Sequence, residues 1–243
     1  MTLRPLLLAT ALTLLPVAAL PSEPLRLVVG EMPPYAMSDD PSGPGALVEL
    51  TQELGRRVGE PVQVAFYPWT RALLASQQPR TLVLPLTRTP ERERNYRWMV
   101  KIYKQKYLFI GRHGDRQLSD PALLRNARVV VVRGTPHKRT LIDAHYAHVS
   151  ECTTVKECMR MVKKGIADAT YGAEDVHRYT AKLDGNKESE FEFSPVFQSG
   201  EVWLAGSTDI SEEEARKWRS ALESARTDGA IARILRKYGA SGS

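Results

Sequence analysis

The feature that most constrains the fold is a regular alternation of short apolar segments with amphipathic ones, which starts near residue 25. The segment LRLVVG has the composition of a buried strand, and Leu47, Leu50 and Leu54 lie on one stripe of the helix that follows. We predict strands over residues 25–30, 62–68 and 81–86, and helices over residues 45–59 and 69–78. This βαβαβ order favours a mainly parallel sheet with helices on both faces.

The same alternation begins again in the second half of the chain. Strands are predicted over residues 127–134 and 167–172, and helices over residues 135–147 and 153–165. Two similar units indicate two lobes, with residues 106–112 as a strand that crosses between them. Residues 201–207 form a further predicted strand, and Ser211 with Glu214 fits a capping box that opens the terminal helices. Because open parallel sheets bind ligands outside the carboxyl ends of their strands, the predicted site is the cleft between the lobes.

The N-terminal residues 1–20 have the pattern of a secretory signal peptide, with Arg4, an apolar stretch, and Val17 and Ala19 before a cleavage site near Ala19. The alternative is a buried N-terminal helix. No later segment offers 18 consecutive apolar residues, so we expect no stable membrane insertion of the mature protein. The segment therefore predicts an exported protein.

The chain has two cysteines, Cys152 and Cys158, and an even count in an exported protein favours a disulfide. Two residues six positions apart in one helix are too distant to be bridged, so the disulfide requires Cys152 to precede the helix over residues 153–165. The alternative is that both thiols are small apolar side chains of a core.

The net charge of +6 comes from 34 Lys and Arg against 28 Asp and Glu, with both signs interspersed along the chain. No basic stripe interleaved with aromatic residues appears, so nucleic-acid binding is not predicted. His145 and His148 have the spacing of one helical face, but no carboxylate or cysteine completes a metal-ligand set with them. We therefore predict no metal and no other cofactor.

Seven segments occur in a characteristic order: LVVGEMPPY, GALVELTQELG, YPWTRALL, LTRTPERERNYRWM, ARVVVVRGT, KKGIADATYG and RTDGAIARILRKYG. In this order, behind a signal peptide, they resemble the periplasmic solute-binding proteins of family 3, the polar amino acid type that serves ABC importers. The likeness covers nearly all of the chain after the signal peptide. It implies a monomeric protein with an ABC permease as its membrane partner.

The resemblance also implies an α/β, two-lobe fold of type II (the Venus flytrap), with a discontinuous first lobe. Residues 24–106 and 200–243 would form lobe 1, and residues 107–199 would form lobe 2. The chain would then cross between the lobes twice, and this two-strand hinge would permit the cleft to open and close.

In this family the arginine of a Thr-x-x-Arg loop binds the α-carboxylate of the ligand, and the matching residue is Arg92, with Thr89 and Thr87 before it. A guanidinium suits this role because its planar fork matches a carboxylate and keeps its charge. The resemblance places further pocket residues at the aromatic walls Trp69 and Tyr35 and at the acid Glu31, and in the second lobe Glu174 or Asp175 could supply an acid. Thr135 and Arg133 are candidates because the free amide groups at the start of their helix can receive an anion. Core packing or solvated loops are the alternatives for these positions. Thr135 is also expected to cap the helix that starts at Pro136.

Two departures put an α-amino acid ligand in doubt. Pro85 replaces the glycine whose carbonyl helps to hold the ligand ammonium, and Ala173 stands near the position of the acid that binds it. A carboxylate-bearing ligand remains predicted.

Two other functions compete with the predicted solute-binding protein. A few relatives of this fold are cyclohexadienyl-dehydratase-like enzymes, for which Glu31, Glu174 and His137 are the candidate acids or bases. Similar lobes also serve as ligand-binding domains associated with sensors. We predict a binding protein rather than an enzyme.

Overall fold

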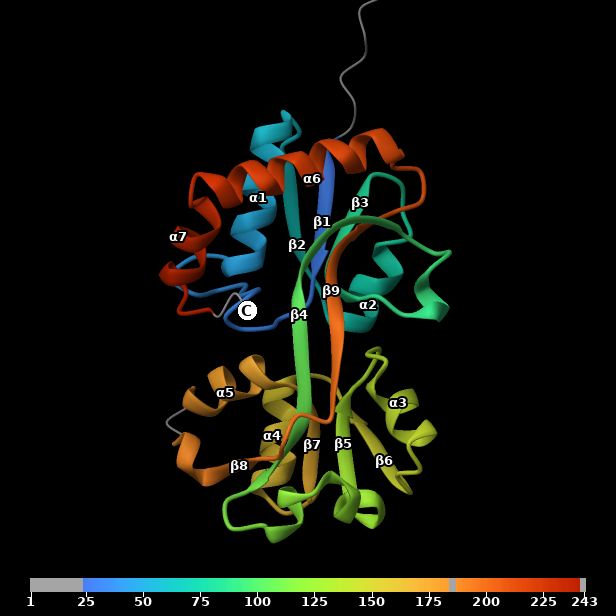
Figure 1. Cartoon of the computed structure of the whole chain (residues 1–243), viewed down its shortest axis with the longest axis vertical. Coiled ribbons are helices and arrows are strands. Elements are labelled where there is room, and N and C mark those ends of the chain that lie inside the picture. The colour runs from blue at the N-terminus through green and yellow to red at the C-terminus, as the bar shows by residue number, and fades with distance from the viewer. Residues whose placement is uncertain (1–23, 184–186, 241–243) are drawn as a thin grey trace, which may run out of the picture.

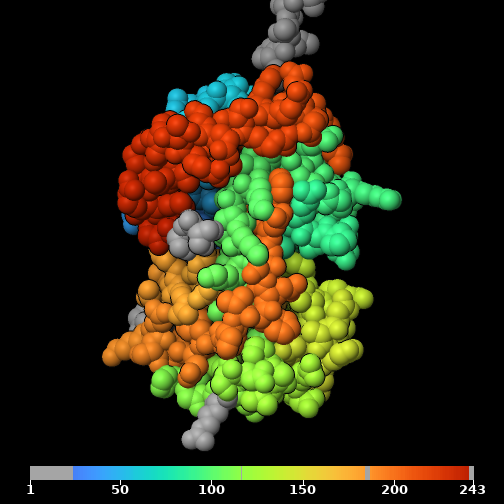
Figure 2. Space-filling view, in the orientation of Figure 1, coloured from blue at the N-terminus to red at the C-terminus, as the bar shows by residue number. Residues whose placement is uncertain are grey.

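The computed structural model describes residues 24–183 and 187–240, and the predicted signal peptide lies outside these residues. Two lobes share one continuous nine-stranded sheet with the strand order β2-β1-β3-β9-β4-β7-β5-β6, and β8 pairs with β4 (Figure 1). In the space-filling view of Figure 2, the outline of the molecule narrows where the lobes meet.

The first lobe is built on parallel strands that alternate with helices. Its strands are β1 (Leu25–Val29), β2 (Val62–Phe66) and β3 (Thr81–Thr87), and its helices are α1 (Ala46–Val58), α2 (Trp69–Ala75), α6 (Glu212–Thr227) and α7 (Ala230–Lys237). Successive side chains of a strand point to opposite faces of the sheet. Leu27 and Val29 therefore enter the core shared with α1, α6 and α7, whereas Val28 packs with Ala72 of α2. Helices cover both faces, as the alternation predicts.

The second lobe repeats this plan. Its strands are β5 (Arg128–Val132), β6 (His148–Cys152), β7 (Ala169–Ala173) and β8 (Phe191–Phe193), and its helices are α3 (His137–Asp143), α4 (Val155–Lys163) and α5 (Glu174–Lys182). Its short 3-10 turns are η2 (Arg116–Ser119), η3 (Pro121–Asn126) and η4 (Glu188–Glu190), whereas η1 (Pro90–Arg92) follows β3 in the first lobe. β5 lies between β6 and β7 and runs parallel to both. The sequence prediction lacked β6 and α5, because both are short and carry few apolar residues.

Two long strands join the lobes. β4 (Arg97–Arg112) and β9 (Gln198–Gly206) pair antiparallel from Arg97 opposite Gly206 to Tyr107 opposite Gln198. β9 also pairs with β3 of the first lobe, and β4 pairs with β7 of the second (Figure 1). The lobe boundaries predicted at residues 106 and 200 fall within these two strands. Bending of the strands as a hinge remains a prediction.

Cys152 and Cys158 form a disulfide in this structure. Cys152 ends β6, and Thr154 caps α4 by accepting a hydrogen bond from the backbone N–H of Glu157, so Cys152 does precede the helix. The turn between them brings the two Cα atoms to 5.6 Å.

One expected helix-end feature follows from side chains that satisfy free backbone groups. Ser211 and Glu214 form the reciprocal capping box at the start of α6. Among the residues that the structure describes, no helix is long and apolar enough to cross a membrane.

Gly45 offers a test of how α1 is seated against the loop that precedes it. Its φ is 98°, and a Cβ there would lie 2.6 Å from the backbone of Tyr35. Gly59 has a φ of 77° but open space around it. We expect Gly45→Ala to reduce the free energy of unfolding by about 2 kcal/mol more than Gly59→Ala does, because both replacements strain φ but only the first also overpacks. Chemical denaturation of both variants measures the difference, and equal losses would contradict this account.

Candidate functional site

A cavity of about 570 Å³ lies between the lobes, where the parallel strands of both lobes end. Glu31 follows β1, Tyr67 follows β2, Thr87 ends β3, and Thr153 follows β6. This is the position that the sheet topology predicts for a ligand site. Aromatic rings supply much of its wall, namely Phe66, Tyr67, Trp69, Tyr103, Tyr107 and Tyr171.

Arg92 lies between the lobes at the edge of this cavity rather than among the residues that line it. Its guanidinium donates hydrogen bonds to the carbonyl oxygens of Thr87 (3.1 Å) in the first lobe and Gly134 (2.9 Å) in the second. Burial lowers the pKa of Arg92, and no carboxylate of residues 24–183 or 187–240 forms an ion pair with it. The contact of Arg92 with a ligand carboxylate remains a prediction.

The two threonines of the Arg92 loop have different surroundings. Thr87 lines the cavity, and its hydroxyl lies 3.0 Å from the hydroxyl of Tyr107. Thr89 does not line the cavity; its carbonyl accepts the backbone N–H of Arg92 at 3.0 Å and so starts the short η1 turn. The structure is therefore compatible with the predicted ligand contact of Thr87. Thr89 supports the loop, and its predicted ligand contact remains untested.

The two residues predicted as aromatic walls also differ in their surroundings. Trp69 lines the cavity at the start of α2 and donates its indole N–H to Gly134 O at 3.2 Å. Tyr35 is buried outside the cavity lining, stacks on Tyr103 and donates its hydroxyl to Asp175. Tyr35 therefore lies behind the cavity wall in this structure, and its contact with a ligand remains a prediction.

The predicted acids lie at the margins of the site. Glu31 lines the exposed rim, and its carboxylate accepts the backbone N–H of Ser38. Glu174 pairs with Arg178 one turn along α5 at 3.0 Å and does not line the cavity. Its neighbour Asp175 instead accepts hydrogen bonds from Tyr35 and from the amide of Gln105 (2.7 Å).

Thr135 lines the cavity, but its predicted helix cap is wrong. Its hydroxyl donates back to Val132 O at 2.6 Å, and Pro136 is the residue at the N-cap of α3. The preceding turn thus uses the hydroxyl that a cap would need. Arg133 is exposed and does not line the cavity.

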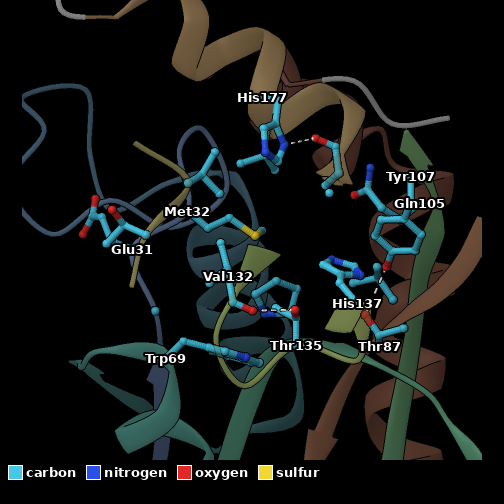
Figure 3. Close-up of a pocket in the computed structure, with 18 of the residues that line it drawn as sticks. Glu31, Met32, Trp69, Thr87, Gln105, Tyr107, Val132, Thr135, His137 and His177 are labelled. Atoms are coloured by element: carbon cyan, nitrogen blue, oxygen red, sulfur yellow. Dashed lines mark hydrogen bonds between the residues drawn. The ribbon is translucent and has the colours of Figure 1, made fainter. Parts of the chain in front are cut away.

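Two buried histidines from the second lobe complete the lining, and the sequence analysis named only one of them, as a possible catalytic group (Figure 3). His137 packs edge-on against Tyr107 (4.9 Å between ring centres) and Tyr171 (5.1 Å). Burial, with smaller effects of charge on His177 and Arg92, lowers the pKa of His137 to about 3. A lone histidine in a helical segment gives no sequence signal that it will lie buried in a cavity wall.

The ring of His177 is oriented by a hydrogen bond. Its Nδ1 lies 2.7 Å from Ala173 O, a group that can only accept, so Nδ1 carries the proton and Nε2 is a bare acceptor. Nε2 is buried and has no hydrogen-bond partner among the described residues. Burial lowers the pKa of His177 to about 4, although the bond to Ala173 acts in the opposite direction.

The described residues contain no group of three or more His, Cys, Asp or Glu side chains arranged to hold a metal ion. His145 lies in the turn after α3 with a φ of 65°, and His148 begins β6, so they do not share a helical face.

The two buried histidines predict a pH dependence of stability. The folded state keeps both neutral at pH values where the unfolded chain, with an ordinary pKa of 6.5, takes up protons. The free energy of unfolding therefore falls as the pH falls below about 6.5, by about 2 kcal/mol for each histidine between pH 7 and pH 5. We expect His177→Gln to show a smaller loss than the wild type over this range, in thermal unfolding followed by circular dichroism.

The exposed His148 gives the control for this measurement. His148→Gln is expected to keep the wild-type dependence, since its side chain lies outside the cavity wall and leaves both buried histidines in place. A wild-type dependence in His177→Gln would show that the ring is not held neutral.

No protein-family model matches the chain, and no curated protein matches it. The similarities found are to solved structures. A histidine kinase sensor domain with similarity to periplasmic binding proteins matches with a TM-score of 0.79 and 18% identity, over 88% of this chain and 95% of that one. An ancestral arginine-binding protein bound to arginine matches with a TM-score of 0.77 and 19% identity, over 88% and 97%.

A third match is a periplasmic binding protein of an arginine transport system from Legionella pneumophila, with a TM-score of 0.76 and 16% identity over 88% of this chain and 99% of that one. These likenesses extend over nearly all of each structure. The chain therefore has the α/β periplasmic-binding-protein fold of type II, as the resemblance in its sequence predicts.

Proposed function

We propose that the protein is an exported, monomeric solute-binding protein that closes on a small organic carboxylate and delivers it to an ABC importer. The observation that carries this proposal is Arg92, a half-buried cation without an acidic partner in the described chain, placed beside a cavity that both lobes enclose. The carbonyls of Thr87 and Gly134 use only part of the donor capacity of its guanidinium. The remaining N–H groups can be met by a ligand carboxylate.

Contacts from both lobes support binding coupled to closure. A ligand shifts a conformational equilibrium only through its preference for one state, and that preference requires groups that converge in the closed form. Trp69 and Thr87 come from the first lobe, whereas Thr135 and His137 come from the second. A solute that touches all four is held more tightly when the lobes are together.

The lining favours an aromatic or cyclic body over a small polar one. Flat rings bury the faces of another ring well, and Trp69, Tyr107 and Tyr171 present such surfaces. The acidic groups that could bind an α-ammonium group are poorly placed or already engaged. Glu31 is at the exposed rim, and Asp175 already accepts from Tyr35 and Gln105. We therefore propose a carboxylate that lacks an α-amino group.

The enzymatic alternative has less support from the same residues. A general base is effective when its pKa lies near the working pH. Burial lowers the pKa of His137 to about 3, which makes it a poor base at neutral pH. Glu174 is paired with Arg178 away from the cavity. Binding without turnover is the function we propose.

A thermal-shift screen of the wild type against aromatic and cyclic carboxylates tests this function. A bound ligand raises the melting temperature once its concentration exceeds its dissociation constant. We expect the best ligand to lose about 2 to 5 kcal/mol of binding free energy in Arg92→Ala, because the variant removes a desolvated charge partner.

Arg94→Ala is the matched control, since Arg94 lies on the same loop, is exposed and does not line the cavity. It should bind the ligand as the wild type does. Retention of the full thermal shift in Arg92→Ala, or no response of the wild type to any carboxylate, would reject the proposed function.

A further inference from the structure

One residue of the second lobe that lines the cavity carries a buried hydrogen-bond acceptor that the described residues do not satisfy. His177 lines the cavity with 1% of its surface exposed, and its Nε2 has no partner among residues 24–183 and 187–240. Buried polar atoms are nearly always hydrogen-bonded, and one that is not destabilises the fold. An unsatisfied acceptor at a cavity wall therefore indicates a missing donor.

The ring cannot exchange its two nitrogens to remove this acceptor. Nδ1 must donate, because its neighbour at 2.7 Å is the carbonyl oxygen of Ala173. The ring also lies directly over Gly172, where a Cβ would come within 2.4 Å of its Cε1 atom. A glycine at this position of β7 lets the Cε1 edge of the imidazole approach the strand. The tautomer and the orientation of His177 are thus both set by its surroundings.

The place of this acceptor in the cavity is opposite the predicted carboxylate site. Figure 3 shows the His177 ring across the cavity from Trp69 and Thr87. Trp69 shares the Gly134 carbonyl with Arg92, and Thr87 offers its own carbonyl to Arg92, so both mark the side on which Arg92 lies. The aromatic rings of Tyr107 and Tyr171, with His137 against them, belong to the wall of the same cavity.

We propose that Nε2 of His177 accepts a hydrogen bond from the ligand, and that the ligand is an aromatic or cyclic carboxylate with a hydroxyl or N–H group at the end remote from its carboxylate. This inference rests on the proposed function, because it takes the carboxylate to lie on the Arg92 side. Sites that contain a buried polar group built for a ligand donor discriminate strongly against the analogue that lacks it. His177 would then determine specificity rather than supply most of the affinity.

Three pairs of acids test the proposal: benzoate, phenylacetate and phenylpropionate, each with its para-hydroxy counterpart. Dissociation constants are measured by calorimetry at pH 7 for the wild type, His177→Phe and His177→Gln. We expect the wild type to bind the hydroxylated member of at least one pair about tenfold more tightly, because only that member satisfies the buried acceptor. His177→Phe should bind both members of that pair equally.

The second variant and a spectroscopic measurement guard against a folding defect in His177→Phe. His177→Gln retains a donor for Ala173 and an acceptor for the ligand, so it should recover part of the hydroxyl preference. In the wild type, the ¹⁵N resonance of His177 Nε2 should move on addition of the hydroxylated acid and stay in place with its partner. His148→Gln, at an exposed site on β6, should keep the wild-type preference.

The outcomes separate this inference from the proposed function. If the wild type binds both members of every pair equally, the ligand does not donate a hydrogen bond to His177, and water would satisfy Nε2 instead. The proposed function would remain in place. A hydroxyl preference that persists in His177→Phe would assign the contact to another residue and reject the inference. If none of the six acids binds, the proposed class of ligand, an aromatic or cyclic carboxylate with a remote donor, is rejected. The proposed function then stands only if another carboxylate of the thermal-shift screen binds and loses affinity in Arg92→Ala.

Discussion

The arrangement of the two lobes depends on the carbonyl oxygen of Gly134, which accepts hydrogen bonds from Arg92 (2.9 Å) and from the indole of Trp69 (3.2 Å). Gly134 has a φ of 80°, and a Cβ there would lie 3.1 Å from both Trp69 and Thr70, so a side chain would crowd these residues of the first lobe. The Tyr35 and Gln105 bonds to Asp175 join the lobes at a second place. These contacts set the size of the cavity between them.

The electrostatic character of that cavity follows from what is buried around it. One guanidinium lies at its edge, and the two imidazoles in its wall are kept neutral because burial penalises their charged forms. Removal of water strengthens every remaining polar interaction. The Arg92 guanidinium and the unsatisfied Nε2 of His177, set beside aromatic rings, therefore carry much of the information about which solute can fill the space.

Much of the fold could be predicted because the apolar periodicity is local. The strands and helices of the first lobe lie close to where the sequence predicts them, and so do β5, α4 and β7. β6 and α5 were missed, since His148–Cys152 and Glu174–Lys182 hold few apolar residues and their state is decided by the strands that they pack against. The disulfide depended on the same point, because only the turn between β6 and α4 brings the cysteines together.

The sequence by itself determined the α/β alternation, the two lobes and the strand ends at which a ligand would lie, since each depends on spacing along the chain. Only the tertiary structure decided which side chains reach the cavity. It placed Trp69 and Thr87 in the wall, directed Tyr35 to Asp175, and brought His177 over Gly172 with one nitrogen free. The physical reason is that hydrogen bonding across the lobes, between residues distant in the chain, sets the final direction of each polar group.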